Sequence, residues 1–201
     1  LPYTLSIYNV SIIDCYFESI SGFTSTGFTI FENIKHLDPS LILWRSTSQW
    51  IGGLYFLFSI ILLIDIFDES LKKSLTELLS FNTSETFKQS FKVLILYAIL
   101  TLIIFIILKF INLRTFDSFN FALTLIASGG FLPTNNLEAV LNSDIKIIVF
   151  SLLTLVSFFS IFLSYNLFFL KQKNLNVFTE DFYLLIYLLF LIVIFFIFFN
   201  F

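Results

Sequence analysis

Long apolar stretches, separated by shorter polar segments, dominate the pattern of this chain. A membrane-spanning helix needs about 20 predominantly apolar residues. Stretches of that length occur at residues 41–66, 91–111, 145–170 and 182–199. The pattern therefore predicts four spanning helices. The last has no polar residue at its centre, so we expect it to face lipid on most sides.

Two further stretches, residues 11–31 and 115–132, keep a helical pattern for only about ten residues before glycine and hydroxyl residues interrupt it. Apolar pieces of ~10–14 residues favour re-entrant or interfacial segments over spans. Each stretch opens with residues that are able to cap a helix, among them Ser11 in the first and Asp117 in the second. The sequence therefore predicts two short helices that enter the membrane and turn back through a polar loop.

The two short segments repeat one another at an offset of 103 residues. This offset aligns four pairs besides the abundant phenylalanines: Asp14 with Asp117, Ser25 with Ser128, Gly27 with Gly130, and Asn33 with Asn136. A long apolar stretch follows each segment, so the repeat unit consists of span, re-entrant helix, polar loop and span. We expect an all-α polytopic membrane protein built from such units.

The predicted organisation has four parts. Residues 1–66 form a first pore unit without its opening helix, and residues 67–90 form a cytoplasmic connection with the pattern of an amphipathic helix or a solvated linker. Residues 91–170 form a complete second unit, and residues 171–201 begin a third. Lysines are in slight excess in the connections after the two units, and the positive-inside rule then places both re-entrant loops on the outer face.

Composition strengthens the membrane interpretation. The chain is 58% hydrophobic and 12% charged, with a mean hydropathy of +0.95, whereas soluble domains carry about 25% charged residues. The net charge of −3 indicates no nucleic-acid partner. Cys15 and His36 are the single cysteine and histidine, so they form neither an internal disulfide nor a metal-binding spacing. We expect no cofactor and no enzyme active site.

The two polar loops are the candidate functional elements. Non-helical backbone survives at membrane depth only inside protein or beside water. Backbone carbonyl oxygens suit a dehydrated monovalent cation, and glycine allows successive carbonyls to point inward. The short helix before each loop would direct its negative C-terminal end at the cation. This pattern is typical of a cation selectivity filter.

The loop sequences also resemble a known family. The stretches FESISGFTSTGFTIF (residues 17–31) and LILWRSTSQWIGG (residues 41–53) resemble the first pore loop and following helix of the Trk/Ktr/HKT potassium transporter superfamily, closest to its bacterial TrkH type. The stretch FDSFNFALTLIASGGF (residues 116–131) is similar to the second pore loop. The resemblance implies four helix–pore loop–helix (M1-P-M2) units around one ion path, of which this chain holds about two.

By that resemblance, each loop contributes five residues to the filter, with Gly27 and Gly130 as the key glycines. They are Thr24, Ser25, Thr26, Gly27 and Phe28 in the first loop, and Ala127, Ser128, Gly129, Gly130 and Phe131 in the second. Potassium, the transported substrate, would bind only at the filter carbonyls. In plant relatives a serine at the first glycine accompanies sodium preference, so Gly27 indicates the potassium type. Leu132 departs from the family, which has a hydroxyl residue there.

Two charged residues near the first loop have alternative roles. Arg45 could extend to the membrane surface, or it could brace the loop by bonding the loop carbonyls or Glu18, which is the interpretation we favour. Glu18 could attract cations to the outer mouth, cap a helix or pair with Arg45. Gly22, Gly52 and Gly53 are more typical of close helix packing than of ligands.

These observations predict potassium uptake across the bacterial inner membrane, in contact with the lipid bilayer. The resemblance further implies a homodimer and a cytosolic nucleotide-binding regulatory subunit of the TrkA/KtrA type. A secondary solute transporter with discontinuous helices is the alternative. It would need inverted repeats and breaks inside full-length spans, whereas both loops here follow short helices on one side. A non-catalytic scaffold would leave the glycine loops unexplained.

Overall fold

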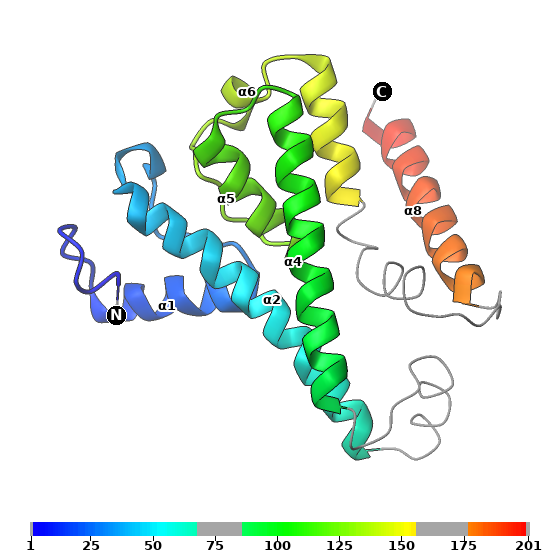
Figure 1. Cartoon of the computed structure of the whole chain (residues 1–201). Helices are drawn as coiled ribbons and strands as arrows, with labels where there is room; N and C mark the ends of the chain where they lie inside the picture. Colours follow the sequence, from blue (N-terminus) through cyan, green and yellow to red (C-terminus); the bar gives the residue numbers. More distant parts are fainter. Residues whose placement is uncertain (1, 68–85, 156–176, 200–201) are drawn as a thin grey trace. The chain divides into compact units, whose positions relative to one another are not determined.

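The structure is a computed structural model, and it describes residues 2–67, 86–155 and 177–199. Throughout these ranges the regular structure is helical. Its elements in chain order are α1 (Ile12–Phe23), the 3₁₀-helix η1 (Ile34–His36), α2 (Pro39–Phe67), α4 (Thr86–Phe110), α5 (Thr115–Ile126), α6 (Leu137–Val140) and α8 (Val177–Phe199) (Figure 1). Residues 144–155 are helical as well. The all-α prediction is confirmed for the described residues.

Helices lie where the sequence predicts spans. α2 covers the span predicted at 41–66, α4 covers all but the last residue of 91–111, and α8 contains 182–199. The span predicted at 145–170 is helical up to residue 155, and its remainder lies outside the described residues. So does most of the connection predicted at 67–90.

One of these helices meets the length and composition expected of a membrane span. In the described part of the chain, one helix is long and apolar enough to cross a membrane by length and composition. It comprises Phe91–Phe110 of α4, which has a mean hydropathy of 2.9 and is 33% buried. Four spans therefore stay a prediction.

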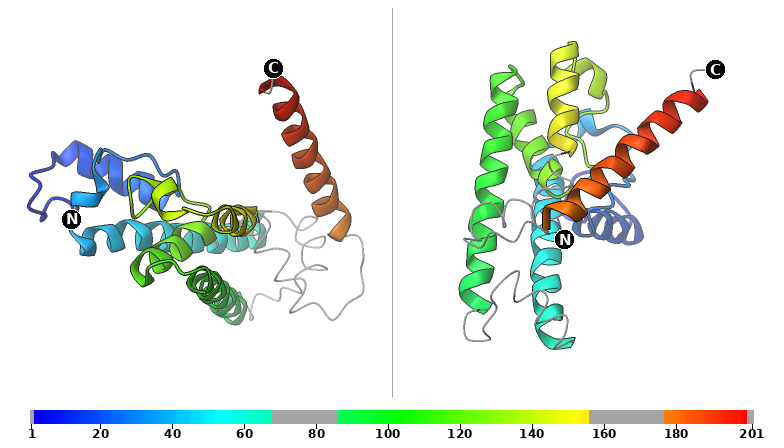
Figure 2. Two further views of the ribbon diagram at one scale, coloured as in Figure 1. Left: turned by 90° about the horizontal axis from the view of Figure 1, so that it is seen from above. Right: turned by 90° about the vertical axis from the view of Figure 1, so that its right-hand side faces the viewer.

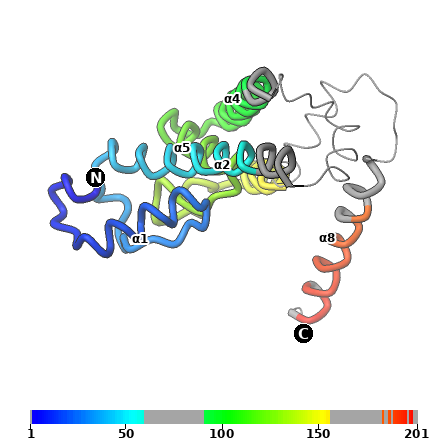
Figure 3. Tube along the Cα trace, turned by 90° about the horizontal axis from the view of Figure 1, so that it is seen from below, coloured from blue at the N-terminus to red at the C-terminus, as the bar shows by residue number. Residues whose placement is uncertain are grey.

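α2 is the central element of the first of two compact units, Leu1–Tyr165. It packs against α1, α4 and α5, and α4 packs against α5. Seen from above and from below, α2 (cyan) lies between α1 (blue) and α4 (green) (Figures 2 and 3). The second unit, Asn166–Phe201, contains α8, and most of the side chains described for that helix are exposed.

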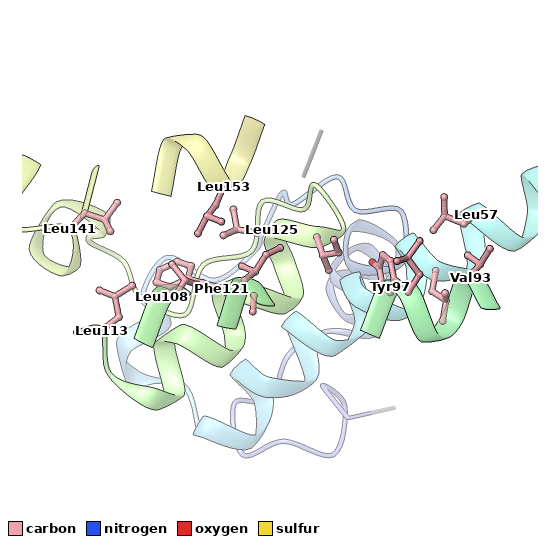
Figure 4. Packing of buried hydrophobic residues seen from close by; sticks show 14 residues of the cluster. Leu57, Val93, Tyr97, Leu108, Leu113, Phe121, Leu125, Leu141 and Leu153 are labelled. Atoms are coloured by element: carbon pink, nitrogen blue, oxygen red, sulfur yellow. The ribbon is translucent and has the colours of Figure 1, made fainter. Parts of the chain in front are cut away.

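The main apolar core forms where α2, α4 and α5 meet. Leu57 of α2, Val93 and Tyr97 of α4, and Phe121 and Leu125 of α5 are all buried in it (Figure 4). Between helices surrounded by lipid, such contacts stabilise mainly through close packing and interhelical hydrogen bonds. This core fixes the second short helix against both long helices.

Polar contacts add to this packing between α2 and α4. Trp50 Nε1 donates to Thr101 Oγ1 at 2.9 Å, and Tyr97 Oη donates to the Trp50 carbonyl at 3.2 Å. The Trp50 and Tyr97 rings lie 5.2 Å apart. A smaller apolar cluster holds the N-terminal segment and η1 against α1 and α2: Tyr3, Cys15, Ile34, Leu37, Leu41 and Ile42.

Candidate functional site

The two short helices end in the same backbone conformation. α1 and α5 each have 12 residues, and both their first and last residues differ by the offset of 103 seen in the sequence. Thr24 (φ −88°, ψ 1°) follows α1, and Ala127 (φ −84°, ψ 0°) follows α5. The next residues, Ser25 and Ser128, both have positive φ, 54° and 50°. The repeat predicted from the sequence is therefore present in the backbone.

Equivalent hydrogen bonds close the two helices. They run from Ser25 N to Gly22 O (3.0 Å) and Thr26 N to Ser21 O (3.0 Å) after α1, and from Ser128 N to Leu125 O (2.9 Å) and Gly129 N to Thr124 O (2.8 Å) after α5. A left-handed residue after a helix usually is glycine. A serine in its place costs about 1–2 kcal/mol. Strain of this kind concentrates at functional sites, and here it occurs in both copies.

The starts of the two helices differ. Ser11 caps α1, and its Oγ accepts from Asp14 N at 3.1 Å, as the sequence predicts. The equivalent position before α5 is Arg114, which makes no side-chain cap. Its guanidinium instead donates to both carboxylate oxygens of Asp117, at 2.7 and 3.0 Å. Asp117, one of the residues predicted to be able to cap α5, therefore makes no cap, because its carboxylate binds the guanidinium of Arg114, the residue immediately before the helix.

The two predicted key glycines are in contact. A Cβ atom added to Gly27 would lie 2.6 Å from Gly130 N and closer still to its Cα. Gly27 also has a φ of 81°, which side chains other than hydrogen rarely permit. A Cβ on Gly130 would lie 3.2 Å from the Gly27 Cα. Two loops that are a hundred residues apart in the chain thus meet backbone to backbone at these two positions.

The carbonyl groups of the loops are largely without internal partners. Within the described residues, no hydrogen bond is donated to the carbonyl oxygens of residues 24–27 or 127–130. Phe28 O differs, because it accepts from Ser21 Oγ at 2.5 Å. The side chains of Thr24 and Thr26 bond to each other at 2.7 Å, and Phe131 is buried. The arrangement offers oxygen ligands whose backbone hydrogen-bonding capacity is unused.

The C-terminal ends of the two short helices rest on adjacent residues of α2. A Cβ on Gly52 would overlap the Phe23 carbonyl at the end of α1. A Cβ on Gly53 would lie 3.1 Å from the Cβ of Ala127, just after α5, and 2.7 Å from the Tyr97 hydroxyl oxygen. These contacts agree with the packing role expected of the two glycines. They bring the negative ends of both helix dipoles to one place.

A buried ion pair lies behind the first loop. Arg45 Nε donates to Glu18 Oε1 at 2.8 Å, and the two side chains are 1% and 0% exposed. Arg45 Nη2 donates to Thr29 Oγ1 at 2.9 Å, and Ile30 N donates to Glu18 Oε2 at 2.9 Å. The Arg45 guanidinium also lies 4.2 Å above the Phe131 ring of the second loop. Arg45 therefore does not extend to the surface, and Glu18 is paired rather than open to cations.

Tyr3 and Asp38 are two of the titratable groups outside the predicted spans whose pKa values are shifted. Burial, with a smaller contribution from the Glu18 carboxylate, raises the pKa of the Tyr3 phenol, which stays neutral at physiological pH. Hydrogen bonds from the side chain and backbone of Ser40 lower the pKa of the exposed Asp38 carboxyl. Asp38 thus remains negative on the side of the first unit where the predicted outer loops lie.

Asn135 joins the segments that follow the two loops, and the sequence analysis missed it. Its Nδ2 donates to Glu32 O and to Asn33 Oδ1, each at 2.9 Å, and its Oδ1 accepts from Lys35 N at 3.1 Å. The repeat drew attention to Asn136 instead, which caps α6 through Ala139 N at 3.1 Å. No local pattern marks Asn135, because its partners are about 100 residues away.

A pocket of about 280 Å³ opens beside the two glycines. Its lining combines both loops with the segments after them: Gly27, Thr29, Glu32, Ile34, Arg45, Gly130, Phe131, Leu132, Thr134 and Asn135. Within the described residues, no group of three or more His, Cys, Asp or Glu side chains is placed to hold a metal ion. Apart from the carboxylate of Glu32, the oxygen atoms of the residues that line this pocket belong to backbone, hydroxyl and amide groups.

The chain is similar in sequence to known cation transporters. No protein-family model matches the chain. The chain is 31% identical over 165 residues to an uncharacterized cation transporter of Methanocaldococcus jannaschii, which covers 76% of this chain and 32% of that protein. It is 25% identical over 182 residues to the Trk system potassium uptake protein TrkH of Escherichia coli K12, covering 86% of this chain and 37% of that protein.

A solved structure is similar as well. The crystal structure of the potassium transporter TrkH from Vibrio parahaemolyticus matches with a TM-score of 0.56 at 24% identity, over 74% of this chain and 29% of that one. At this identity the match concerns the fold. The chain spans about a third of the length of the relatives that it matches over most of its own sequence.

Proposed function

Because this chain belongs to the TrkH-type potassium transporters, we propose that it forms part of a potassium uptake path across the inner membrane. Relatives over most of its sequence are named as potassium uptake proteins or cation transporters, which supports transport rather than catalysis. The relatives are about three times as long, so the chain contributes a part of the path. The all-α membrane fold follows from the same relationship.

The loops at residues 24–28 and 127–130, together with Phe131, would form two parts of a selectivity filter. The observation that carries this proposal is the backbone contact of Gly27 with Gly130, between two loops of equal conformation. Most carbonyls of these loops accept no hydrogen bond from the residues that the structure describes. Carbonyl oxygens can replace the hydration shell of a potassium ion. The adjoining ends of α1 and α5 add negative potential at the same place.

The Glu18–Arg45 pair would support the first loop. It holds the chain just after the filter residues through Thr29 and Ile30. A buried ion pair is stable only when its geometry is good and its remaining groups are bonded. Both carboxylate oxygens of Glu18 accept hydrogen bonds, whereas Arg45 Nη1 has no hydrogen-bond partner among the described residues. Because the two charges neutralise one another, Arg45 adds little repulsion toward a nearby cation.

The remaining parts of the proposal rest on the family relationship. They are an outer position of the filter loops, a homodimer, and a cytosolic nucleotide-binding regulatory subunit of the TrkA/KtrA type. A secondary solute transporter gains no support, because each loop follows a 12-residue helix and does not interrupt a full-length span.

The test is uptake of rubidium and sodium by the full-length protein in bacteria that lack their own potassium uptake systems, with its regulatory partner present. We expect the parent to take up rubidium in preference to sodium and Gly27→Ser to lose that preference. Asn142→Ser, a change at an exposed residue bonded to Lys146, serves as the control. Absence of cation uptake by a well-expressed parent would contradict the proposed function. Unchanged uptake and selectivity in Gly27→Ser would mean that Gly27 is not part of the selectivity filter.

A further inference from the structure

Gln49 of α2 lies between the two filter loops and contacts both. Its side chain is fully buried, at 0% exposure. It occupies the helix that packs against both α1 and α5. The side chain faces one loop, and the backbone carbonyl of the same residue faces the other. This double contact is independent of the Glu18–Arg45 pair.

The side-chain contact is with the second loop. Gln49 Oε1 accepts from Phe131 N at 3.2 Å, across 82 residues of sequence. A Cβ on Gly129 would overlap the Gln49 amide, and its distance to Nε2 would be 2.8 Å. The amide therefore lies directly against the backbone on both sides of Gly130, one of the two glycines in contact. Its Nε2 has no hydrogen-bond partner within the described part of the chain.

The contact with the first loop is weaker and uses the backbone. Ser25 Oγ donates to Gln49 O at 3.5 Å, and Ser25 is the residue with a φ of 54°. The backbone contact of Gly27 with Gly130 then links the two loops directly. A displacement of the second loop would therefore change its distance to the first.

At the positions equivalent to Gln49 and Arg45, the described part of the second pore unit (residues 91–170) carries apolar residues. At the offset of 103 that relates the two units, Gln49 corresponds to Leu152 and Arg45 to Ile148. Both are apolar and exposed, at 55% and 57%, in the helical residues 144–155. The loops repeat, but the polar side chains behind them do not. α2 of the first unit supplies these contacts for both loops.

From this asymmetry we infer that Gln49 is the positioning residue that sets the second filter loop against the first and thereby tunes discrimination between potassium and sodium. This inference rests on the proposed function. Discrimination by carbonyls depends on their number, spacing and rigidity. Without the Gln49 acceptor, the buried Phe131 N–H must find another partner, and the loop must move to reach one.

The test compares the rubidium-to-sodium uptake ratio of full-length parent, Gln49→Met and Gln49→Glu, at equal amounts of protein in the membrane. Gln49→Met keeps the volume and removes the acceptor, and we expect the ratio to fall about five-fold, the weight of one hydrogen bond. Gln49→Glu keeps an oxygen for Phe131 N, and because burial favours the neutral carboxyl, we expect a ratio within about two-fold of the parent by the same measure. Ser46→Ala, at a buried residue bonded to its own helix, is the control.

A general loss of folding would lower both fluxes together, whereas loss of positioning changes their ratio. If Gln49→Met does not reach the membrane, Gly129→Ala decides, because its methyl group would displace the same amide from the other side. The inference is overturned if Gln49→Met keeps the rubidium-to-sodium uptake ratio of the parent, or if Gly129→Ala keeps it when Gln49→Met does not reach the membrane. It is also overturned if Gln49→Met and Gln49→Glu lower this ratio equally. Failure of the proposed function gives a different result, because the parent protein itself would then transport no rubidium.

Discussion

The two glycines in contact should differ sharply in their tolerance of a methyl group. Alanine at either position adds the same single carbon to the same contact, so the pair Gly27→Ala and Gly130→Ala is internally matched. Gly27 has a φ of 81°, whereas Gly130 lies outside the left-handed region. The new methyl group would meet different surroundings in the two variants.

The magnitude follows from backbone strain and overlap. An alanine in the left-handed region costs about 1–2 kcal/mol. That cost corresponds to a roughly 5- to 30-fold smaller population of the native loop. The Cβ at Gly27 would also lie 2.6 Å from Gly130 N, and backbone cannot rotate away as a side chain can. At Gly130 the nearest atom is 3.2 Å away, so a shift of a few tenths of an ångström suffices.

The assay is the initial rate of rubidium uptake by the full-length protein, corrected for the amount in the membrane. We expect Gly27→Ala to lose at least about ten-fold in rate, in line with this strain. Gly130→Ala should lose less than about three-fold, because alanine at a compatible φ also restricts the unfolded chain. Thermal unfolding of both purified variants controls for general damage.

Equal losses in the two variants, or a larger loss in Gly130→Ala, would refute this reasoning. Such a result would mean that the loops meet in another geometry, with Gly130 in the strained position. If both variants take up rubidium at the rate of the parent, the contact between the two glycines is not part of the transport path.

Two further pairs of variants test the surroundings of the filter. Arg45→Gln should destabilise the full-length protein by about 3–5 kcal/mol, because it leaves buried Glu18 unpaired. Lys146→Gln, at a lysine that bonds the exposed Asn142 side chain, should cost about 0.5 kcal/mol or less; similar melting temperatures for the two would argue against a supporting ion pair. Asn135→Ala should reduce rubidium selectivity several-fold by removing hydrogen bonds between the loops. Asn136→Ala removes a helix cap worth about 1 kcal/mol and should keep parental selectivity. An equal loss of selectivity in Asn135→Ala and Asn136→Ala would contradict a specific role for Asn135 in joining the two loop regions.

The local features of the fold were predictable because they depend on neighbouring residues. The apolar period and the glycine and serine signals predicted two short helices followed by loops, and α1 and α5 have these positions. The sequence repeat aligned Ser25 with Ser128, and both residues have positive φ. The pairing of Arg45 with Glu18 was foreseen as one of several alternatives, since opposite charges in apolar surroundings have few other partners.

The contacts between the two pore-loop regions were not predictable in the same way. In the sequence, Gln49 was only one residue of the stretch LILWRSTSQWIGG, and no pattern indicated a role for Asn135. Their partners lie 82 and about 100 residues away, so no spacing along the chain reveals them. The same amide side chains would be equally compatible with a solvated loop or an ordinary helix surface.

The sequence by itself thus determined the class of protein, the two short helices and the repeat of their loops, because hydropathy and helix-ending signals act over a few residues. The tertiary structure decided which of these residues meet. α2 packs between α1 and α5 through Gly52 and Gly53, and this packing brings Gly27 against Gly130. It also gives both loops their polar support from one helix, which the symmetry of the repeat alone would have divided between two.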